Sequence, residues 1–273
     1  MCPKIVTLGP FTIYGFGLMV GIAFIVASIL LTLELKRKKL DPDLGNTVTL
    51  IALVAGIGGA KILFLFENWQ DFLRAPVEMT FSASGLTWYG GFILAVGCIY
   101  YYAKKKTISF AKISDATSPS LILGYGIARI GCHLSGDGDY GFPTSLPWGT
   151  NYEHGTYPPS IAFRDFPEIA GQFPNGVVPD NTPLHPTPVY EFIVCTLLFI
   201  VLWRLARRKL PDGSIFMWYL VLAGAERFTL EFLRINPPVL LGLSEAQVIA
   251  IVLIAIGIYG IRRLNIRSKP ALP

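Results

Sequence analysis

The sequence predicts an all-α, polytopic membrane protein with about seven transmembrane helices and an outer cap. Two observations predict this class: the balance of apolar and charged residues, and the placement of the basic residues. Of the 273 residues, 52% are hydrophobic and only 15% are charged, whereas soluble domains carry about 25% charged residues. The four cysteines lie far apart and form no CxxC pair. A disulfide scaffold is therefore excluded, as is a disordered chain.

Seven segments are long and apolar enough to cross a bilayer, which requires about 20 mostly apolar residues. They are 11–34, 46–66, 86–103, 114–132, 188–205, 214–235 and 240–261. The first, fifth and seventh are the clearest, while glycine or charged residues interrupt the other four. We therefore expect residues 1–273 to form a single integral membrane domain.

The basic residues predict how the chain is oriented. Four lysines or arginines follow each odd-numbered segment, which accounts for 16 of the 23 basic residues. Because basic residues concentrate on the cytoplasmic side, we expect the N-terminus outside and the C-terminus in the cytoplasm. The net charge of +5 then reflects topology and attraction to anionic membrane lipids, and nucleic acid is not an expected partner.

The longest connection, 133–187, joins the fourth and fifth segments on the predicted outer (periplasmic or extracellular) side. It is rich in proline, glycine and aromatic residues, including Tyr140, Trp148 and Tyr152. A connection of this length is usually functional or disordered. Because tryptophan and tyrosine favour the headgroup region of a bilayer, we expect a compact cap that lies on the outer interface.

Four basic residues fall within or at the ends of the apolar segments: Lys61, Arg129, Arg227 and Arg234. A charged side chain at the bilayer centre costs about 2.5–3.5 kcal/mol, so such residues mark a site, form a structural ion pair, or extend to the interface. Arg227, Glu231 and Arg234 are spaced i, i+4 and i+7, which places them on one helix face. Because Glu231 offsets one arginine, the face stays net positive and suits a phosphate.

The fourth segment ends in a glycine-rich stretch that carries several reactive side chains. Cys132 and His133 lie one helical turn after Arg129. Asp137 and Asp139 follow in a turn that is too rich in glycine to stay helical. The two aspartates do not fit a calcium loop. Such a loop needs glycine at its sixth position and glutamate at its twelfth, and this chain has neither at those positions. No histidine pair has zinc-ligand spacing, so we expect no metal site.

Short motifs in a fixed order add to this picture. They are Tyr14-Gly15, Gly59-Ala60-Lys61, Trp88-Tyr89-Gly90-Gly91, Asp115 with Pro119, the stretch from Ala128-Arg129 to Gly141, His185-Pro186, Tyr190-Glu191, Arg227 with Glu231 and Arg234, and Gln247. Together with the seven segments and their orientation, they resemble the prolipoprotein diacylglyceryl transferase family, bacterial membrane enzymes that lipidate lipoprotein precursors. Tyr89 stands where many members carry histidine, and Cys132 stands where the signature usually has asparagine.

The resemblance implies an enzyme of the bacterial cytoplasmic (inner) membrane that acts on phosphatidylglycerol and prolipoprotein signal peptides. A diacylglyceryl group moves from phosphatidylglycerol to the thiol of the lipobox cysteine, a thioether forms and glycerol phosphate leaves. The resemblance implies no metal or cofactor. We expect Arg129 and Arg227, from two different helices, to hold the lipid phosphate. The alternatives are a catalytically altered or inactive lipid-binding homologue, motivated by Tyr89 and Cys132, and an anion or lipid transporter.

The remaining expected roles concern the base and the substrate contacts. The thiol needs help to ionise, because the pKa of free cysteine is about 8.5. His185, Tyr89, Asp137 and Asp139 are the candidates for the base, and the sequence does not choose between them. The expected substrate-binding residues are Tyr14, Lys61, Cys132, Ser135, Gly141, Tyr190, Glu191, Glu231 and Arg234.

Overall fold

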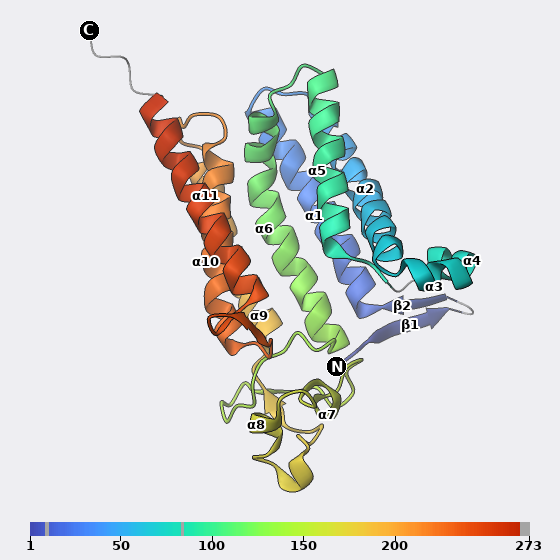
Figure 1. The fold of residues 1–273 in the computed structure, drawn as a ribbon. Helices are drawn as coiled ribbons and strands as arrows, with labels where there is room; N and C mark the ends of the chain where they lie inside the picture. Colours follow the sequence, from blue (N-terminus) through green and yellow to red (C-terminus); the bar gives the residue numbers. More distant parts are fainter. Residues whose placement is uncertain (9–10, 83–84, 268–273) are drawn as a thin grey trace. The chain divides into compact units, whose positions relative to one another are not determined.

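The computed structural model describes residues 1–8, 11–82 and 85–267. Within these residues, seven helices are 17 residues long or longer (Figure 1). They are α1 (Gly15–Arg37), α2 (Asp43–Glu67), α5 (Trp88–Lys105), α6 (Phe110–Ser135), α9 (Thr187–Leu205), α10 (Ser214–Leu230) and α11 (Glu245–Arg267). Each coincides with one of the seven predicted segments, with boundaries that differ by a few residues.

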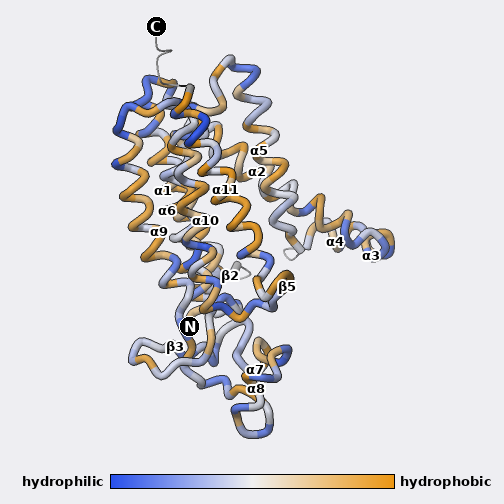
Figure 2. Tube along the Cα trace, turned by 60° about the vertical axis from the view of Figure 1, so that its left-hand side comes forward, coloured by the Kyte–Doolittle hydropathy of each residue, from blue (hydrophilic) through white to orange (hydrophobic). Residues whose placement is uncertain are grey.

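Four of these helices, α1, α2, α9 and α11, are long and apolar enough to cross a membrane by length and composition. Apolar residues predominate along α9 and α11, and polar residues gather toward helix ends (Figure 2). The other three long helices are less uniform: α10 has 17 residues, and α6 contains Pro119. The prediction of a mostly helical protein is confirmed, and four of its described helices are candidates to span a membrane.

The chain divides into two compact units, of which one is formed by residues 28–116. Its main contact is between α2 and α5. Gly59 on α2 and Gly90 on α5 lie so close that a Cβ atom on either would overlap the carbonyl oxygen of the other. Small residues allow helices in a bilayer to approach in this way. The buried core of this unit contains Leu31, Leu35, Leu44, Val48, Ala103, Ile113 and Ala116.

The other unit is formed by residues 1–27 and 117–273. Its closest helix pair is α10 with α11, where a Cβ atom on Gly224 would lie 2.9 Å from the carbonyl oxygen of Ala250. Gly126 has the same function between α6 and α9, because a Cβ atom there would lie 2.8 Å from Cβ of Cys195. These glycines bring together the helices that carry the candidate site.

The connection between α6 and α9 has a core of its own. It contains the short helices α7 (Pro159–Ala162) and α8 (Pro167–Ala170), the 3-10 turn η1 (Pro174–Gly176), and the paired strands β3 (Thr150–Asn151) and β4 (Pro183–Leu184). Its buried core consists of Tyr140, Tyr152, Ala162, Phe163, Ala170, Val178 and Leu184. We refer to residues 136–186 as the cap.

The burial of the cap aromatics refines the sequence interpretation. Tyr140, Tyr152 and Phe163 are at most 1% exposed, so they form the core of the cap and do not contact lipid headgroups. Each buried aromatic side chain of this size contributes about 1.5–3 kcal/mol to folding. Trp148 and Tyr157 are exposed and stay available for the interface that the sequence predicts.

The structure corrects the ends of two predicted segments. Residues 11–14 form strand β2 (Phe11–Tyr14), which pairs with β1 (Lys4–Leu8), because β-branched and aromatic residues favour a strand. The segment expected to begin at residue 240 starts instead with β5 (Pro238–Leu240) and β6 (Leu243–Ser244), and α11 begins at Glu245. Pro237 and Pro238, the second of which is the first residue of β5, cannot continue the helix that precedes them.

The sequence also did not predict two short helices between α2 and α5. These are α3 (Trp69–Arg74) and α4 (Pro76–Phe81), and Pro76 occupies the first turn of α4, where its missing N–H is not needed. Their large apolar residues Trp69, Leu73, Val77 and Phe81 are all exposed.

Candidate functional site

Glu191, in the second turn of α9, is the centre of a buried ion-pair cluster. Its side chain is fully buried, and three guanidinium groups contact its carboxylate. Arg129 of α6 pairs with Oε2 through Nε. Arg227 of α10 and Arg234 beyond it reach Oε1 at 3.2 and 3.1 Å. The predicted convergence of arginines from separate helices is therefore present in the structure.

Two further carboxylates complete this arginine cluster, which we define as Arg129, Arg227, Arg234, Asp139, Glu191 and Glu231. Asp139 pairs with both Arg129 and Arg234. Glu231 lies 3.0 Å from Arg227 and 3.6 Å from Arg234. Three guanidinium groups thus face three carboxylates. The formal charge is balanced, whereas the sequence interpretation assigned Glu231 alone as counter-ion and expected a net positive face.

The prediction that Arg227, Glu231 and Arg234 lie on one helix face is only partly correct. Arg227 and Glu231 do pair across one turn. However, α10 ends at Leu230, a short 3-10 helix, η2 (Glu231–Leu233), follows, and Arg234 has extended backbone at φ −91° and ψ 153°. Arg234 joins the cluster because the chain straightens there and turns its side chain toward Glu191 and Asp139.

Backbone pairing between the cap and the end of α10 holds Asp139 and Arg234 together. Gly141 and Arg234 form an antiparallel bridge, and the backbone N–H of Phe142 donates to the carbonyl oxygen of Leu233 at 3.1 Å. A Cβ atom on Gly141 would overlap that same carbonyl oxygen. Glycine at this position therefore serves the close backbone approach, and no substrate contact is needed to explain it.

Tyr125, one turn before Arg129 on α6, belongs to the same network and was missed by the sequence analysis. Its hydroxyl oxygen accepts a hydrogen bond from Arg129 Nε at 3.0 Å and donates one to Glu191 Oε2 at 3.3 Å. The guanidinium carbon of Arg129 lies 5.0 Å from the centre of the Tyr125 ring. The i, i+4 spacing from Arg129 is the signal that would have identified it.

The members of the cluster differ in their access to the surface. The side chains of Arg227 and Asp139 are 26% and 28% exposed, while those of Arg234 and Glu231 are 6% and 2% exposed. The other carboxylate oxygen of Glu231, Oε1, accepts hydrogen bonds from Ser244 and Asn236, both at 2.7 Å. A ligand can therefore reach Arg227 and Asp139, whereas Glu231 and Arg234 form the support.

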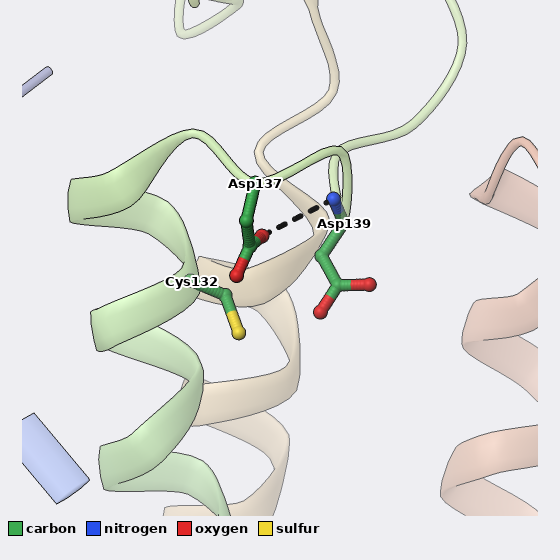
Figure 3. Close-up of side chains that lie close together, drawn as sticks. All are labelled: Cys132, Asp137 and Asp139. Carbon is green, nitrogen blue, oxygen red and sulfur yellow. Dashed lines mark hydrogen bonds between the residues drawn. The ribbon is translucent and has the colours of Figure 1, made fainter. Parts of the chain in front are cut away.

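The turn after α6 places Asp137 beside Cys132 and Asp139 (Figure 3). Gly136 and Gly138 have φ values of +59° and +94°, which favour glycine, and the helix ends before them as predicted. Burial and then the charge of Asp139 raise the pKa of Asp137. Burial would also raise the pKa of Asp139, but Arg129 and Arg234 outweigh it and lower that pKa to about 2.

Cys132, Asp137 and Asp139 offer three ligand atoms within 4.8 Å of one another. Two of these side chains, Cys132 and Asp139, already have cationic partners. Arg129 Nη1 donates to the Cys132 sulfur at 3.4 Å and pairs with Asp139. Because two guanidinium groups share the Asp139 carboxylate, a metal cation would meet their positive charge at close range. The residues present therefore do not favour a cation here.

His185 and Tyr190 form a second, more exposed polar group at the start of α9. His185 Nδ1 lies 3.3 Å from the hydroxyl of Tyr190, and that hydroxyl accepts a hydrogen bond from Trp148 Nε1 at 2.7 Å. The backbone of His185 is held on both sides, because Gly141 donates to its carbonyl oxygen and its N–H donates to Phe142. Burial lowers the pKa of His185, so its imidazole is neutral at pH 7.

Four other residues of the expected site have contacts that do not involve the cluster. Lys61 and Tyr89 lie in the unit formed by residues 28–116, where Lys61 Nζ contacts Ser82 and the Tyr89 ring meets Trp88. Tyr14 is an exposed residue of β2. Ser135 donates to the carbonyl oxygen of Cys132 at 3.1 Å, which is a local contact within the last turn of α6.

Apolar helices together with a buried polar cluster toward the ends of α6, α9 and α10 indicate a membrane protein with a candidate site of arginine and carboxylate side chains. The model of the prolipoprotein diacylglyceryl transferase family matches residues 3–263. The chain belongs to this family, and the resemblance found in the sequence is confirmed.

Curated relatives agree with this assignment over nearly the full chain. A protein from Leptospira interrogans is 30% identical, with 96% of this chain and 91% of the relative covered. One from Clostridium tetani is 31% identical over 95% of this chain and 96% of the relative. A third, from Trichormus variabilis, is 28% identical over 98% and 91%. All three are named phosphatidylglycerol–prolipoprotein diacylglyceryl transferase.

Proposed function

We propose that this protein transfers the diacylglyceryl group of phosphatidylglycerol to the lipobox cysteine thiol of prolipoproteins, with Arg129 and Arg227 holding the lipid phosphate. Membership of the family and the names of the relatives support the reaction. The observation that carries the site assignment is the meeting of Arg129 and Arg227, from two helices, on the carboxylate of Glu191. In this proposal, the site binds prolipoprotein signal peptides and membrane lipids.

The unused donors of the two arginines are the proposed phosphate contacts. Arg129 uses Nε and Nη1, and Arg227 uses Nη1 and Nη2, in the contacts above. Within the described residues, Arg129 Nη2 and Arg227 Nε have no hydrogen-bond or ion-pair partner. A guanidinium has five N–H donors in a rigid plane, so two arginines fixed by Glu191 can each turn a free edge toward one phosphate.

The proposed chemistry is a displacement at the glycerol carbon that bears the phosphate. The thiol loses its proton to a base, sulfur forms a bond to that carbon, and the carbon–oxygen bond to phosphate breaks. Glycerol phosphate leaves with the electron pair, and the arginines stabilise the negative charge on it. Because they are held in place before the reaction, they need no reorganisation as that charge develops.

The shifts in pKa of Asp137, Asp139 and His185 favour some candidates for the base over others. Asp139, with a pKa of about 2 and two arginine partners, is a weak base. The neutral imidazole of His185 and the carboxylate of Asp137, whose pKa is raised, are better suited to accept a proton near pH 7. Tyr89 stays a candidate. We propose that Asp139, Glu191, Glu231 and Arg234 position the phosphate-binding arginines.

We further propose seven transmembrane helices in a bacterial cytoplasmic (inner) membrane, with the N-terminus and the cap outside and the C-terminus in the cytoplasm. Helices α5 and α10 have 18 and 17 residues, which gives lengths of about 27 and 26 Å at 1.5 Å per residue. A hydrocarbon core of about 30 Å is within reach of both with a small local adjustment. The basic ends of α1, α5, α9 and α11 support the orientation.

Cysteine labelling in intact cells tests the orientation. Cys2 is exposed, and Cys132 and Cys195 are buried. A membrane-impermeant maleimide should label Cys2 without permeabilisation. It should label a Lys209→Cys variant, which lacks Cys2 through Cys2→Ser, only after permeabilisation. The opposite pattern would reverse the proposed topology.

A reconstituted assay tests the activity. Purified protein, phosphatidylglycerol and a lipobox peptide should give a peptide whose mass has increased by one diacylglyceryl group. Arg129→Ala and Arg227→Ala should each lower the rate at least 100-fold, whereas Arg262→Ala, an exposed arginine of α11, should leave it unchanged. Wild-type protein that leaves the peptide unmodified, with bound phosphatidylglycerol still detectable, would favour an inactive lipid-binding homologue. Flux of lipid or phosphate across vesicles would favour the transporter.

A further inference from the structure

The opposite end of α9 carries a second concentration of arginine that the proposed reaction does not use. Arg204 lies 13 residues after Glu191 on the same helix, which corresponds to about 20 Å along the axis. A pocket of about 420 Å³ opens there between α9 and α10. It is lined by Val201, Arg204, Leu205, Arg208, Trp218 and Leu222.

The charges in this pocket differ from those of the arginine cluster. Arg204 and Arg208 are exposed, and within the described residues neither has an ion-pair partner. The intervening Arg207 is engaged elsewhere, since it donates to the carbonyl oxygen of Trp203 and lies 4.3 Å from the centre of its ring. The pocket therefore presents two guanidinium groups, Arg204 from the last turn of α9 and Arg208 from the turn after it, and no carboxylate lines it.

The walls of the pocket are apolar. Val201 and Leu205 come from α9, and Trp218 and Leu222 from α10. Val201 is 49% exposed and Trp218 is 37% exposed, so these walls are open at the side of the helix pair. A ligand that fills this space needs an apolar part along α9 and α10 and an anionic part at Arg204 and Arg208.

We propose that this pocket binds an anionic phospholipid, with the phosphate between Arg204 and Arg208 and an acyl chain against Val201, Trp218 and Leu222. Basic pockets between transmembrane helices are typical binding sites for anionic headgroups. The flat indole of Trp218 suits the boundary between headgroup and acyl chain. Because this site lies at the far end of α9 from Glu191, its lipid is a bound structural ligand and not the lipid that reacts.

Fluorescence quenching tests the proposal with the full-length protein in phosphatidylcholine nanodiscs. The emission lost in a Trp218→Phe variant defines the signal of Trp218. Brominated phosphatidylglycerol should quench that signal at least three-fold more than brominated phosphatidylcholine at the same mole fraction. In the double variant Arg204→Gln/Arg208→Gln the two lipids should quench Trp218 equally.

A matched control and a soluble competitor complete the experiment. Arg262→Gln/Arg263→Gln removes the same charge from exposed positions of α11 outside the pocket, and it should keep the preference for phosphatidylglycerol. Glycerol phosphate at millimolar concentration should not reduce quenching; if it does, the site holds a free phosphate and the assignment to a lipid is wrong. Equal quenching by both lipids in the wild type, or a preference that survives in Arg204→Gln/Arg208→Gln, would also overturn the proposal. The transfer rate of that double variant should match the wild type, which shows that it is folded.

Discussion

Lys61 and Arg129 are both basic residues within predicted transmembrane segments, but their side chains have different kinds of polar partner. Lys61 Nζ lies 3.0 Å from the hydroxyl and from the carbonyl oxygen of Ser82, the residue after α4, and 5.4 Å from the centre of the Phe64 ring on its own helix. Arg129 contacts carboxylates from two other elements, Asp139 and Glu191. We propose that the convergence of carboxylates from separate elements on a charge in a membrane helix is what marks a candidate site.

The largest expected effect is that of Glu191→Gln, because it removes the carboxylate shared by three guanidinium groups. Breaking a buried ion pair from one side costs about 3–5 kcal/mol. We expect transfer activity to be lost and the melting temperature in detergent to fall sharply. Glu153→Gln, at an exposed carboxylate of the cap, is the control and should change neither. A Glu191→Gln protein with normal stability and rate would show that the arginines do not need their common partner.

The second effect is a pH dependence that comes from Asp139. Its pKa falls from the ordinary 3.8 to about 2 in the folded protein. A lowered pKa stabilises the fold above the ordinary value, and this contribution is lost as the pH falls from about 4 to about 2; it amounts to at most about 2 kcal/mol. Thermal unfolding of the wild type should lose more stability over this range than that of Asp139→Asn. Parallel curves for the two proteins would contradict the ion pairs of Asp139 with Arg129 and Arg234.

A smaller effect is expected for Tyr125→Phe. The change removes the hydroxyl between Arg129 and Glu191 and keeps the ring against the guanidinium. A single hydrogen bond of this kind contributes about 0.5–1.5 kcal/mol, which corresponds to a decrease of about 2- to 10-fold in kcat/KM. Tyr101→Phe, at an exposed position of α5, controls for the loss of a hydroxyl. An unchanged kcat/KM would limit Tyr125 to packing.

The smallest effect is expected for Lys61→Met, which keeps the length of the side chain and removes its charge. If Lys61 serves only local structure, transfer in the reconstituted assay should stay within two-fold of the wild type. Because the sequence analysis placed Lys61 among the substrate-binding residues, this variant decides between the two interpretations. A loss of ten-fold or more, with an unchanged melting temperature, would return Lys61 to the substrate site.

The sequence predicts the helices well because a bilayer leaves few alternatives. Within an apolar environment, backbone groups must be satisfied inside a helix, so length and hydropathy locate the spans. The end of α6 was predicted from Gly136 and Gly138, and the start of α9 from Pro188 in its first turn. Helix ends next to β5 were not predicted, because hydropathy does not distinguish an apolar hairpin from an apolar helix.

The sequence predicted which residues belong to the candidate site better than it predicted how they contact one another. The spacing of Arg227 and Glu231 correctly predicted their contact. The sharing of Glu191 by three arginines depends on how α6, α9 and α10 meet, and no local spacing encodes that. The pairing of Asp139 with Arg234 depends likewise on the backbone bridge at Gly141. The functional roles of these residues stay predictions until the variants are measured.

The backbone pairing at the two ends of the cap determines how much the length of the cap between them can change. The backbone N–H of Gly141 donates to the carbonyl oxygen of His185, and Pro143 pairs with Leu184, so both ends of the cap are fastened beside the cluster. Chain between two fastened ends can lengthen cheaply, since each doubling of a flexible loop costs only about 0.6 kcal/mol. An epitope tag or fluorescent domain spliced into an exposed turn such as the one at Asn175 should therefore be tolerated, and would report on the enzyme in living cells without disturbing its chemistry.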